Sequence, residues 1–267
     1  MTKYYVTHSF KIIILFLSLS ALTMLTLGFS TLKTRFGPIP AEAYLLSAIE
    51  EFYRNAVPFE LTFDEVLYMW QLAIPLIAAF NSYYFLKFYK SNMIFMLNKK
   101  SRYLYETQKN TTINALIGAL SIFIGYIICL TITAYFFPTR GITTTRYTLF
   151  TNLRIDSFFW SNHYYLYYML KGFFDYFIVP FELILLGNCI GLISENKYLV
   201  IISTLLYYIF GICVLTMILN IPFNLNYFEQ IINKDKMCEY LIIYHLVYFF
   251  IINIISIKYI NIKRERV

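Results

Sequence analysis

Three ionisable residues in one apolar stretch have the types and the spacing to handle protons or ions. Lys171 and Asp175 are four residues apart, and Glu182 follows seven residues later, so a regular helix places all three on one face. Charges inside a membrane are costly and commonly mark ion or proton pathways. We therefore take Lys171, Asp175 and Glu182 as a candidate intramembrane polar site. In the alternative interpretation, Lys171 and Asp175 pair near the outer surface, which leaves Glu182 as the one deep acid.

The remaining reactive residues do not form a catalytic or metal-binding pattern. The sequence contains no GxxxxGK[ST], HExxH or GxSxG motif, and its four cysteines show no CxxC spacing. His245 lies among Tyr244, Tyr248 and Phe249, where a hydrogen-bonded packing role is the simplest interpretation. We expect a protein that is not an enzyme and that holds no catalytic residue, cofactor or metal of its own.

A second group of polar residues lies between two apolar runs. The stretch NKKSRYLYETQKN, residues 98–110, sets four cations against the single acid Glu106. Such charge can fix topology and meet anionic lipid headgroups. It can also dock a soluble partner, because a short amphipathic helix there would present cations beside aromatic rings. The candidate docking residues are Lys99, Lys100, Arg102, Tyr103, Tyr105 and Lys109.

The elements that must position both groups are apolar helices. Of the 267 residues, 59% are hydrophobic and only 14% are charged, and apolar runs of membrane-spanning length recur along the chain. These features predict an all-α integral membrane protein with one transmembrane domain over residues 1–267. We expect six spans, at about 12–29, 66–85, 112–137, 165–190, 198–219 and 240–260.

The distribution of charge predicts the orientation of these spans. Lys and Arg concentrate in the N-terminus, the 87–110 loop, the turn at 194–197 and the C-terminal tail, whereas the 31–65 loop is acidic. The positive-inside rule then places both termini in the cytoplasm. The 138–163 loop is locally basic, so its outer location follows from the number of spans. The net charge of +7 is explained by topology and does not indicate nucleic acid.

Further features concern the segments next to the spans. Pro75 inside the second span predicts a kink, since proline removes a helical hydrogen bond. Thr62 and Glu65 form a capping-box pattern ahead of that span. Within the 31–65 loop, apolar residues at helical spacing predict a short amphipathic helix on the outer surface.

The order of these features resembles the permease subunits of ABC-2 type transporters, especially those of bacterial peptide, bacteriocin or immunity systems. The matching residues are Pro75 in LAIPLIAAF and the pattern Arg-x2-Tyr-x3-Lys formed by Arg102, Tyr105 and Lys109. A short inner turn flanked by Gly187 and Gly191, in LGNCIGLISENKYLVII, is also similar. The sequence departs from the family in FNSYYFLKFY, which is bulkier than usual after the second apolar run.

The resemblance implies a function in export. Residues 87–110 would contain a coupling helix that fits a cleft on a separate ATP-binding-cassette subunit, which binds ATP and Mg. The chain would pair with a second permease subunit in a bacterial cell membrane and move a peptide or lipid-like substrate outward. Two alternatives stay open: a stand-alone bacteriocin-immunity or sensor membrane protein, and an ion-coupled secondary transporter that uses Asp175 and Glu182.

Overall fold

The protein is helical throughout the part of the chain that the structure, a computed structural model, describes. That part comprises residues 6–19, 21, 73–87, 100–136, 164–194, 196–211, 243 and 245–255, and it contains no strand. The all-α prediction is therefore confirmed over these residues. Several predictions fall outside them: the capping box at Thr62, the amphipathic helix of the 31–65 loop, the outer loops 138–163 and 220–238, and residue Lys99.

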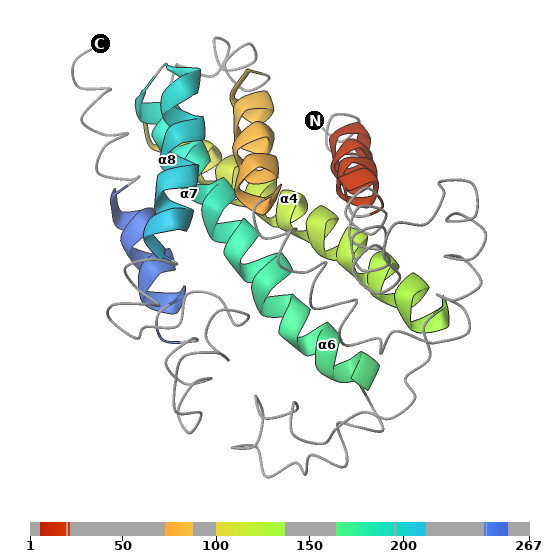
Figure 1. Ribbon diagram of the computed structural model, residues 1–267. Coiled ribbons are helices and arrows are strands. Elements are labelled where there is room, and N and C mark those ends of the chain that lie inside the picture. The colour runs from red at the N-terminus through yellow and green to blue at the C-terminus, as the bar shows by residue number, and fades with distance from the viewer. Residues whose placement is uncertain are drawn as a thin grey trace.

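Two long helices form the centre of the bundle (Figure 1). The first is α4, Lys100–Phe136, and the second is the continuous run of α6, Tyr164–Phe173, the π-helical turn η3, Phe174–Ile178, and α7, Val179–Ile193. They lie side by side in opposite directions, so the start of α4 lies near the end of α7.

Shorter helices flank this pair. Helix α8, Lys197–Phe210, packs on α7, and the helix His245–Ile255 lies beside α8. The helix Val6–Leu19 and the helix over residues 73–87 lie on the other side of the pair (Figure 1). The turn predicted at 194–197 is confirmed, since α7 ends at Ile193 and Asn196 caps α8 by accepting a hydrogen bond from the Tyr198 amide at 2.9 Å.

The basic stretch and the predicted third span form one helix rather than two elements. Helix α4 runs for 37 residues from Lys100. No glycine or proline occurs in it before Gly118, so nothing in the sequence interrupts the backbone hydrogen bonds at the expected boundary near residue 112. The predicted short coupling helix is thus the beginning of α4 over the residues described.

Proline explains the π-helical turn. Pro180 has no backbone N–H, and its ring would clash with the carbonyl four residues earlier. One residue before it, the Val179 amide bonds to the carbonyl of Phe174, a spacing of five. This wider turn lets the helix pass Pro180 without ending. The expected kink at Pro75 lies at the third described residue of its helix, so the segment that would bend away lies outside the described part.

Among the described residues, two helices are long and apolar enough to cross a membrane: Glu106–Ile132 and Tyr168–Leu192. They overlap the predicted third and fourth spans. The apolar helices Val6–Leu19, Tyr198–Phe210 and His245–Ile255 are shorter than a span needs over their described lengths. Length and composition therefore give limited support to a membrane protein.

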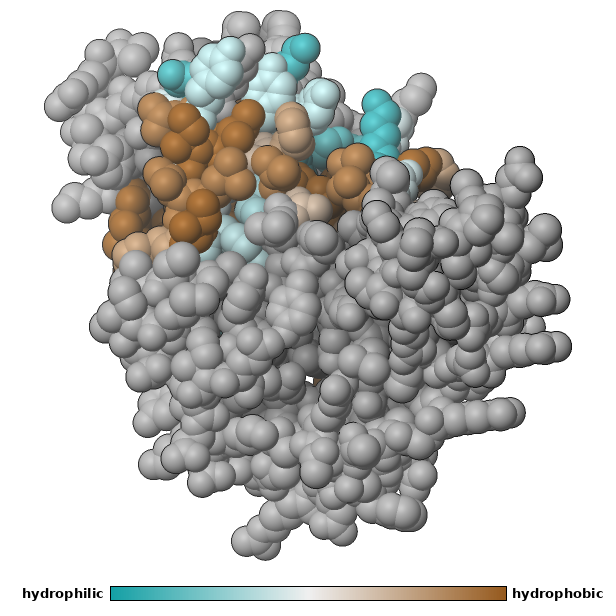
Figure 2. Space-filling model, viewed as in Figure 1, coloured by the Kyte–Doolittle hydropathy of each residue, from teal (hydrophilic) through white to brown (hydrophobic). Residues whose placement is uncertain are grey.

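The distribution of side chains adds to that support. On α8, Ile202, Leu206 and Ile209 are exposed while Thr204 is fully buried. Figure 2 shows apolar side chains gathered over α8 and the helix His245–Ile255. The buried polar or charged residues of the bundle are Asn81, Ser82, Thr107, Asn110, Thr111, Asn114, Ser121, Asp175, Glu182, Asn188, Thr204 and His245. Apolar side chains on the outside, with polar groups among the apolar residues of the core, are the arrangement expected when the surroundings are hydrocarbon.

Candidate functional site

Amide side chains from three helices and one histidine meet inside the bundle. We call this group, His8, Asn81, Asn114 and Asn188, the amide cluster. Asn114 Nδ2 donates to Asn81 Oδ1 at 3.2 Å and to Asn188 Oδ1 at 3.4 Å. His8 Nε2 lies 3.1 Å from the same Asn81 oxygen. The cluster therefore links the helix Val6–Leu19, the helix 73–87, α4 and α7.

Backbone groups and a small residue hold the cluster in place. Asn188 Nδ2 donates to the carbonyl of Thr111 at 3.1 Å, and Ser82 Oγ donates to the carbonyl of Ile184 at 3.1 Å. Gly118 lies one turn beyond Asn114 on α4, and a side chain there would overlap Asn81 Nδ2. Close approach of helices through glycine, with polar side chains bonded across the interface, is typical of membrane helix packing.

His8 is held in one tautomer by this contact. Asn81 Oδ1 can only accept, so the hydrogen bond requires a proton on His8 Nε2. His8 precedes the apolar run that begins at Ile12. Burial lowers its pKa from the ordinary value; the hydrogen bond to Asn81 opposes this, and the charge of Lys11 adds to it. The ring is neutral at pH 7.

A second polar contact lies on the other side of α7. We call Glu182 and His245 the acid–imidazole pair. Glu182 Oε1 lies 2.6 Å from His245 Nδ1, and the two side chains are only 2% and 6% exposed. The second carboxyl oxygen, Oε2, is buried with no hydrogen-bond partner in the described part of the chain. The short distance is typical of a charge-assisted hydrogen bond.

Stacked aromatic rings join the helices next to the pair. Phe181 of α7 stacks on Phe249, and Tyr207 of α8 stacks on Tyr248, so both α7 and α8 pack against the helix His245–Ile255. A buried acid that shares a proton with an imidazole can hold or pass a proton.

The predicted polar site contains the π-helical turn. Asp175 lies inside η3 and is 1% exposed, whereas Glu182 lies beyond it in α7. The wide turn accommodates an extra residue, which rotates everything after it by about 100° relative to a regular helix. The prediction of a shared face for Asp175 and Glu182 assumed a regular helix, and Glu182 bonds to His245 on another helix. Lys171 belongs to α6.

The candidate docking residues are placed in sequence order along α4. Lys100, Arg102, Tyr103 and Tyr105 form its first turns, and Lys109 is exposed. Glu106 begins the apolar segment of the same helix.

Sequence reasoning missed both contacts between helices. It treated His245 as a hydrogen-bonded packing residue without naming Glu182 as its partner, and it did not consider the three asparagines. A search for a buried base to match the deep acid Glu182 would have found His245, because both lie in apolar runs. Among the residues described, no three His, Cys, Asp or Glu side chains gather in a way that could hold a metal.

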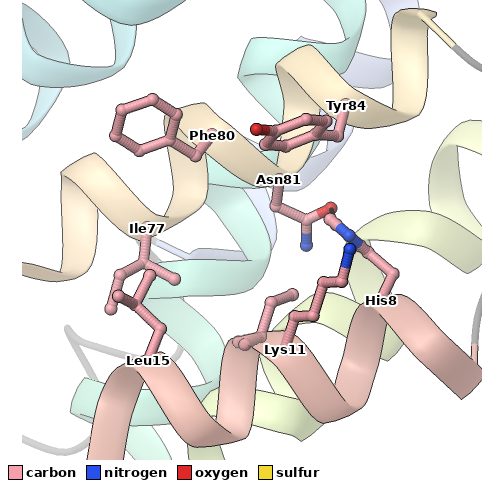
Figure 3. A pocket seen from close by; sticks show the side chains of 8 residues that line it. His8, Lys11, Leu15, Ile77, Phe80, Asn81 and Tyr84 are labelled. Carbon is pink, nitrogen blue, oxygen red and sulfur yellow. Dashed lines mark hydrogen bonds between the residues drawn. The ribbon is translucent and has the colours of Figure 1, made fainter. Parts of the chain in front are cut away.

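A half-open groove adjoins the amide cluster. It lies between the helices Val6–Leu19 and 73–87 and has a volume of about 170 Å³. Figure 3 shows His8 and Lys11 rising from the first helix toward Asn81 on the second. Leu15, Ile77 and Phe80 line the other part of the groove.

Comparison with known proteins gave no match: no family model, no curated protein and no solved structure is similar to this chain at a significant level.

Proposed function

We propose that the chain is the membrane-spanning permease subunit of an ABC-2 type exporter, driven by separate ATPase subunits and moving a peptide or other amphipathic substrate out of a bacterial cell. The observation that carries this proposal is the continuity of α4. One helix joins the basic, aromatic stretch that begins at Lys100 to the residues that hold the bundle together.

The contacts of α4 would let this continuous helix transmit a force from its first turns to the bundle. Asn114 and the Thr111 carbonyl bond to helices 73–87 and α7, 11 to 14 residues after the start of α4. An α-helix resists compression because every turn is hydrogen-bonded to the next. A push by a partner on the first turns therefore reaches the amide cluster without loss.

The cluster also fits the alternating direction of the first four predicted spans. His8 precedes the predicted first span, Asn81 is late in the second, Asn114 is early in the third and Asn188 is late in the fourth. Helices that alternate in direction bring these starts and ends to one side of a bundle, and the structure bonds the four residues to one another.

Partner docking is tested by charge reversal. In Arg102→Glu, a like charge meets an acidic partner surface, which costs several kcal/mol at an interface. Tyr105→Ala removes an aromatic anchor. Both variants should lose co-purification of the ATPase encoded beside the gene and its substrate-stimulated activity. Lys197→Glu, a charge reversal on the same side but outside α4, is the matched control.

Full partner binding by both variants would refute the docking role and reduce the stretch to a topology determinant. If the wild-type protein captures no ATPase, the stand-alone immunity or sensor alternative replaces the exporter.

Topology is tested by labelling. A membrane-impermeant thiol reagent should reach Cys238 from outside intact cells and should reach a cysteine placed at Asn98 only from inside. Labelling of position 98 in intact cells would overturn the orientation.

A second candidate function, ion-coupled transport, is favoured by the acid–imidazole pair. If Glu182 carries protons for transport, Glu182→Gln should abolish transport while leaving expression unchanged. In an ATP-driven exporter the same variant should transport normally, because glutamine can still accept a hydrogen bond from His245. We expect the second result.

A further inference from the structure

We propose that the groove between the helices Val6–Leu19 and 73–87 binds a membrane lipid with an anionic headgroup. The inference rests on the membrane placement in the proposed function, but not on the ATPase partner. Two observations carry it: an exposed cation and an apolar surface that meet in one cavity.

The polar half of the groove has donors for an anion. Lys11 is exposed and makes no ion pair with any residue that the structure describes. Its side chain points toward Asn81 (Figure 3). Asn81 forms the floor of this part of the groove and is 1% exposed. The three N–H groups of the Lys11 ammonium can therefore bind an anion beside a neutral polar side chain.

The other half of the groove suits an acyl chain. Leu15, Ile77 and Phe80 line it, and Leu15 and Phe80 are 43% and 47% exposed. Tyr84, which is 51% exposed, lies at the polar end, where an aromatic ring with a hydroxyl group fits the membrane interface. The groove therefore changes from cationic to apolar along its length, which complements a phospholipid that changes from an anionic headgroup to apolar chains.

Its position also favours a lipid over a soluble anion. The groove opens between helices whose outer faces are apolar, at Phe10 and Ile14 on one and Leu76 on the other. A ligand that enters there passes through hydrocarbon. The cationic end lies beside His8, on the side where the sequence places the cytoplasm and where anionic lipids concentrate in a membrane.

The test is native mass spectrometry of the purified full-length protein with phosphatidylglycerol, phosphatidylcholine and diacylglycerol. We expect phosphatidylglycerol to bind at least five-fold more tightly than the other two. Lys11→Gln should remove that preference and Lys11→Arg should retain it. Lys87→Gln is the matched control. It removes an exposed cation at the end of the helix 73–87 near Tyr84, outside the groove, and should bind like the wild type.

A variant in the apolar half separates a lipid from a free anion. Leu15→Trp fills the groove without changing charge and should weaken phosphatidylglycerol binding as strongly as Lys11→Gln. Glycerol 3-phosphate at millimolar concentration should not displace the lipid, because it lacks the chain. Thermal unfolding of each variant in detergent checks that it is folded.

Three results would each overturn the site. They are an equal loss of phosphatidylglycerol binding in Lys11→Gln and Lys87→Gln, binding of diacylglycerol as tight as that of phosphatidylglycerol, and displacement of the lipid by glycerol 3-phosphate. None of these measurements needs an ATPase. Loss of the exporter hypothesis would therefore leave this result unchanged, whereas a chain that takes up no lipid at all would refute the site and the membrane placement together.

Discussion

The amide cluster and the acid–imidazole pair hold the same bundle together with different chemistry. The cluster uses neutral groups and divides its hydrogen bonds among four helices, so no single side chain carries the whole contact. The pair places two ionisable groups in one bond between α7 and the helix His245–Ile255. Losing one neutral donor leaves neutral acceptors behind, whereas losing one ionisable partner leaves a buried group that must be neutralised or solvated. The two regions should therefore differ in how strongly they respond to single changes.

The largest effect should come from Glu182→Ala. It leaves His245 buried without its acid, and breaking a buried pair of this kind costs about 3–5 kcal/mol. The free energy of unfolding in mixed detergent micelles measures the loss. The double variant Glu182→Ala with His245→Phe should recover most of it, because both polar groups are then gone. A single variant that loses less than about 1 kcal/mol would contradict the contrast between the two regions.

Gly118→Leu should have the next largest effect. Its side chain would overlap Asn81 Nδ2 and Ile184 and push the helix 73–87 away from α4. Overpacking of this kind costs about 1–3 kcal/mol. Leu120→Ala, on the exposed face of the same helix, is the control and should change stability by less than about 0.5 kcal/mol. Equal effects at the two positions would mean that Gly118 is not a point of close approach.

Asn114→Ala should cost less. It removes two hydrogen bonds, and bonds between membrane helices average about 0.6 kcal/mol each, so a loss of about 1 kcal/mol is expected. The same unfolding measurement applies. A loss as large as that of Glu182→Ala would show that the cluster, not the pair, dominates the stability of the bundle.

The smallest effect concerns pH. Because the pKa of His8 is lower in the folded protein, the unfolded chain takes up a proton first as the pH falls. His8 should therefore reduce the free energy of unfolding as the pH drops below 6.5, the ordinary pKa of the histidine side chain. Above that pH it should have no effect. The difference in unfolding free energy between the wild type and His8→Gln, followed from pH 8 to about pH 5, isolates this contribution. A difference that grows in the opposite direction would contradict burial as the cause.

Composition and hydropathy sufficed to predict the helices, because apolar runs of this length have few other ways to satisfy their backbone groups. The turn at 194–197 followed from a short polar interruption between two such runs, and Asn196 caps α8 as its residue type suggests. The extent of α4 was not predicted. The start of the third span was predicted near residue 112, where the sequence changes from polar to apolar. A helix ends at a residue that breaks its hydrogen bonds, such as glycine or proline, and neither occurs there.

The two polar regions could not be predicted by considering one segment of the sequence at a time. Asn81 and Asn188 are separated by more than 100 residues, and the sequence around each of them does not indicate that both bond to Asn114. The prediction that Asp175 and Glu182 share a face assumed a regular helix. Pro180 is evident in the sequence, but the π-helical turn before it was not predicted, and it changes the helical period between the two acids.

The length of α4 sets how movement at one end of it is scaled at the other. At 1.5 Å per residue, Lys100 lies about 17–21 Å from the bonds at Thr111 and Asn114, and Phe136 lies about 33–38 Å beyond them. If the bonds of the amide cluster hold α4 at this point, the two parts of the helix are lever arms with lengths in a ratio of about one to two. In the proposed exporter, a sideways displacement of about 1 Å at the basic end would then move the opposite end by about 2 Å in the opposite direction.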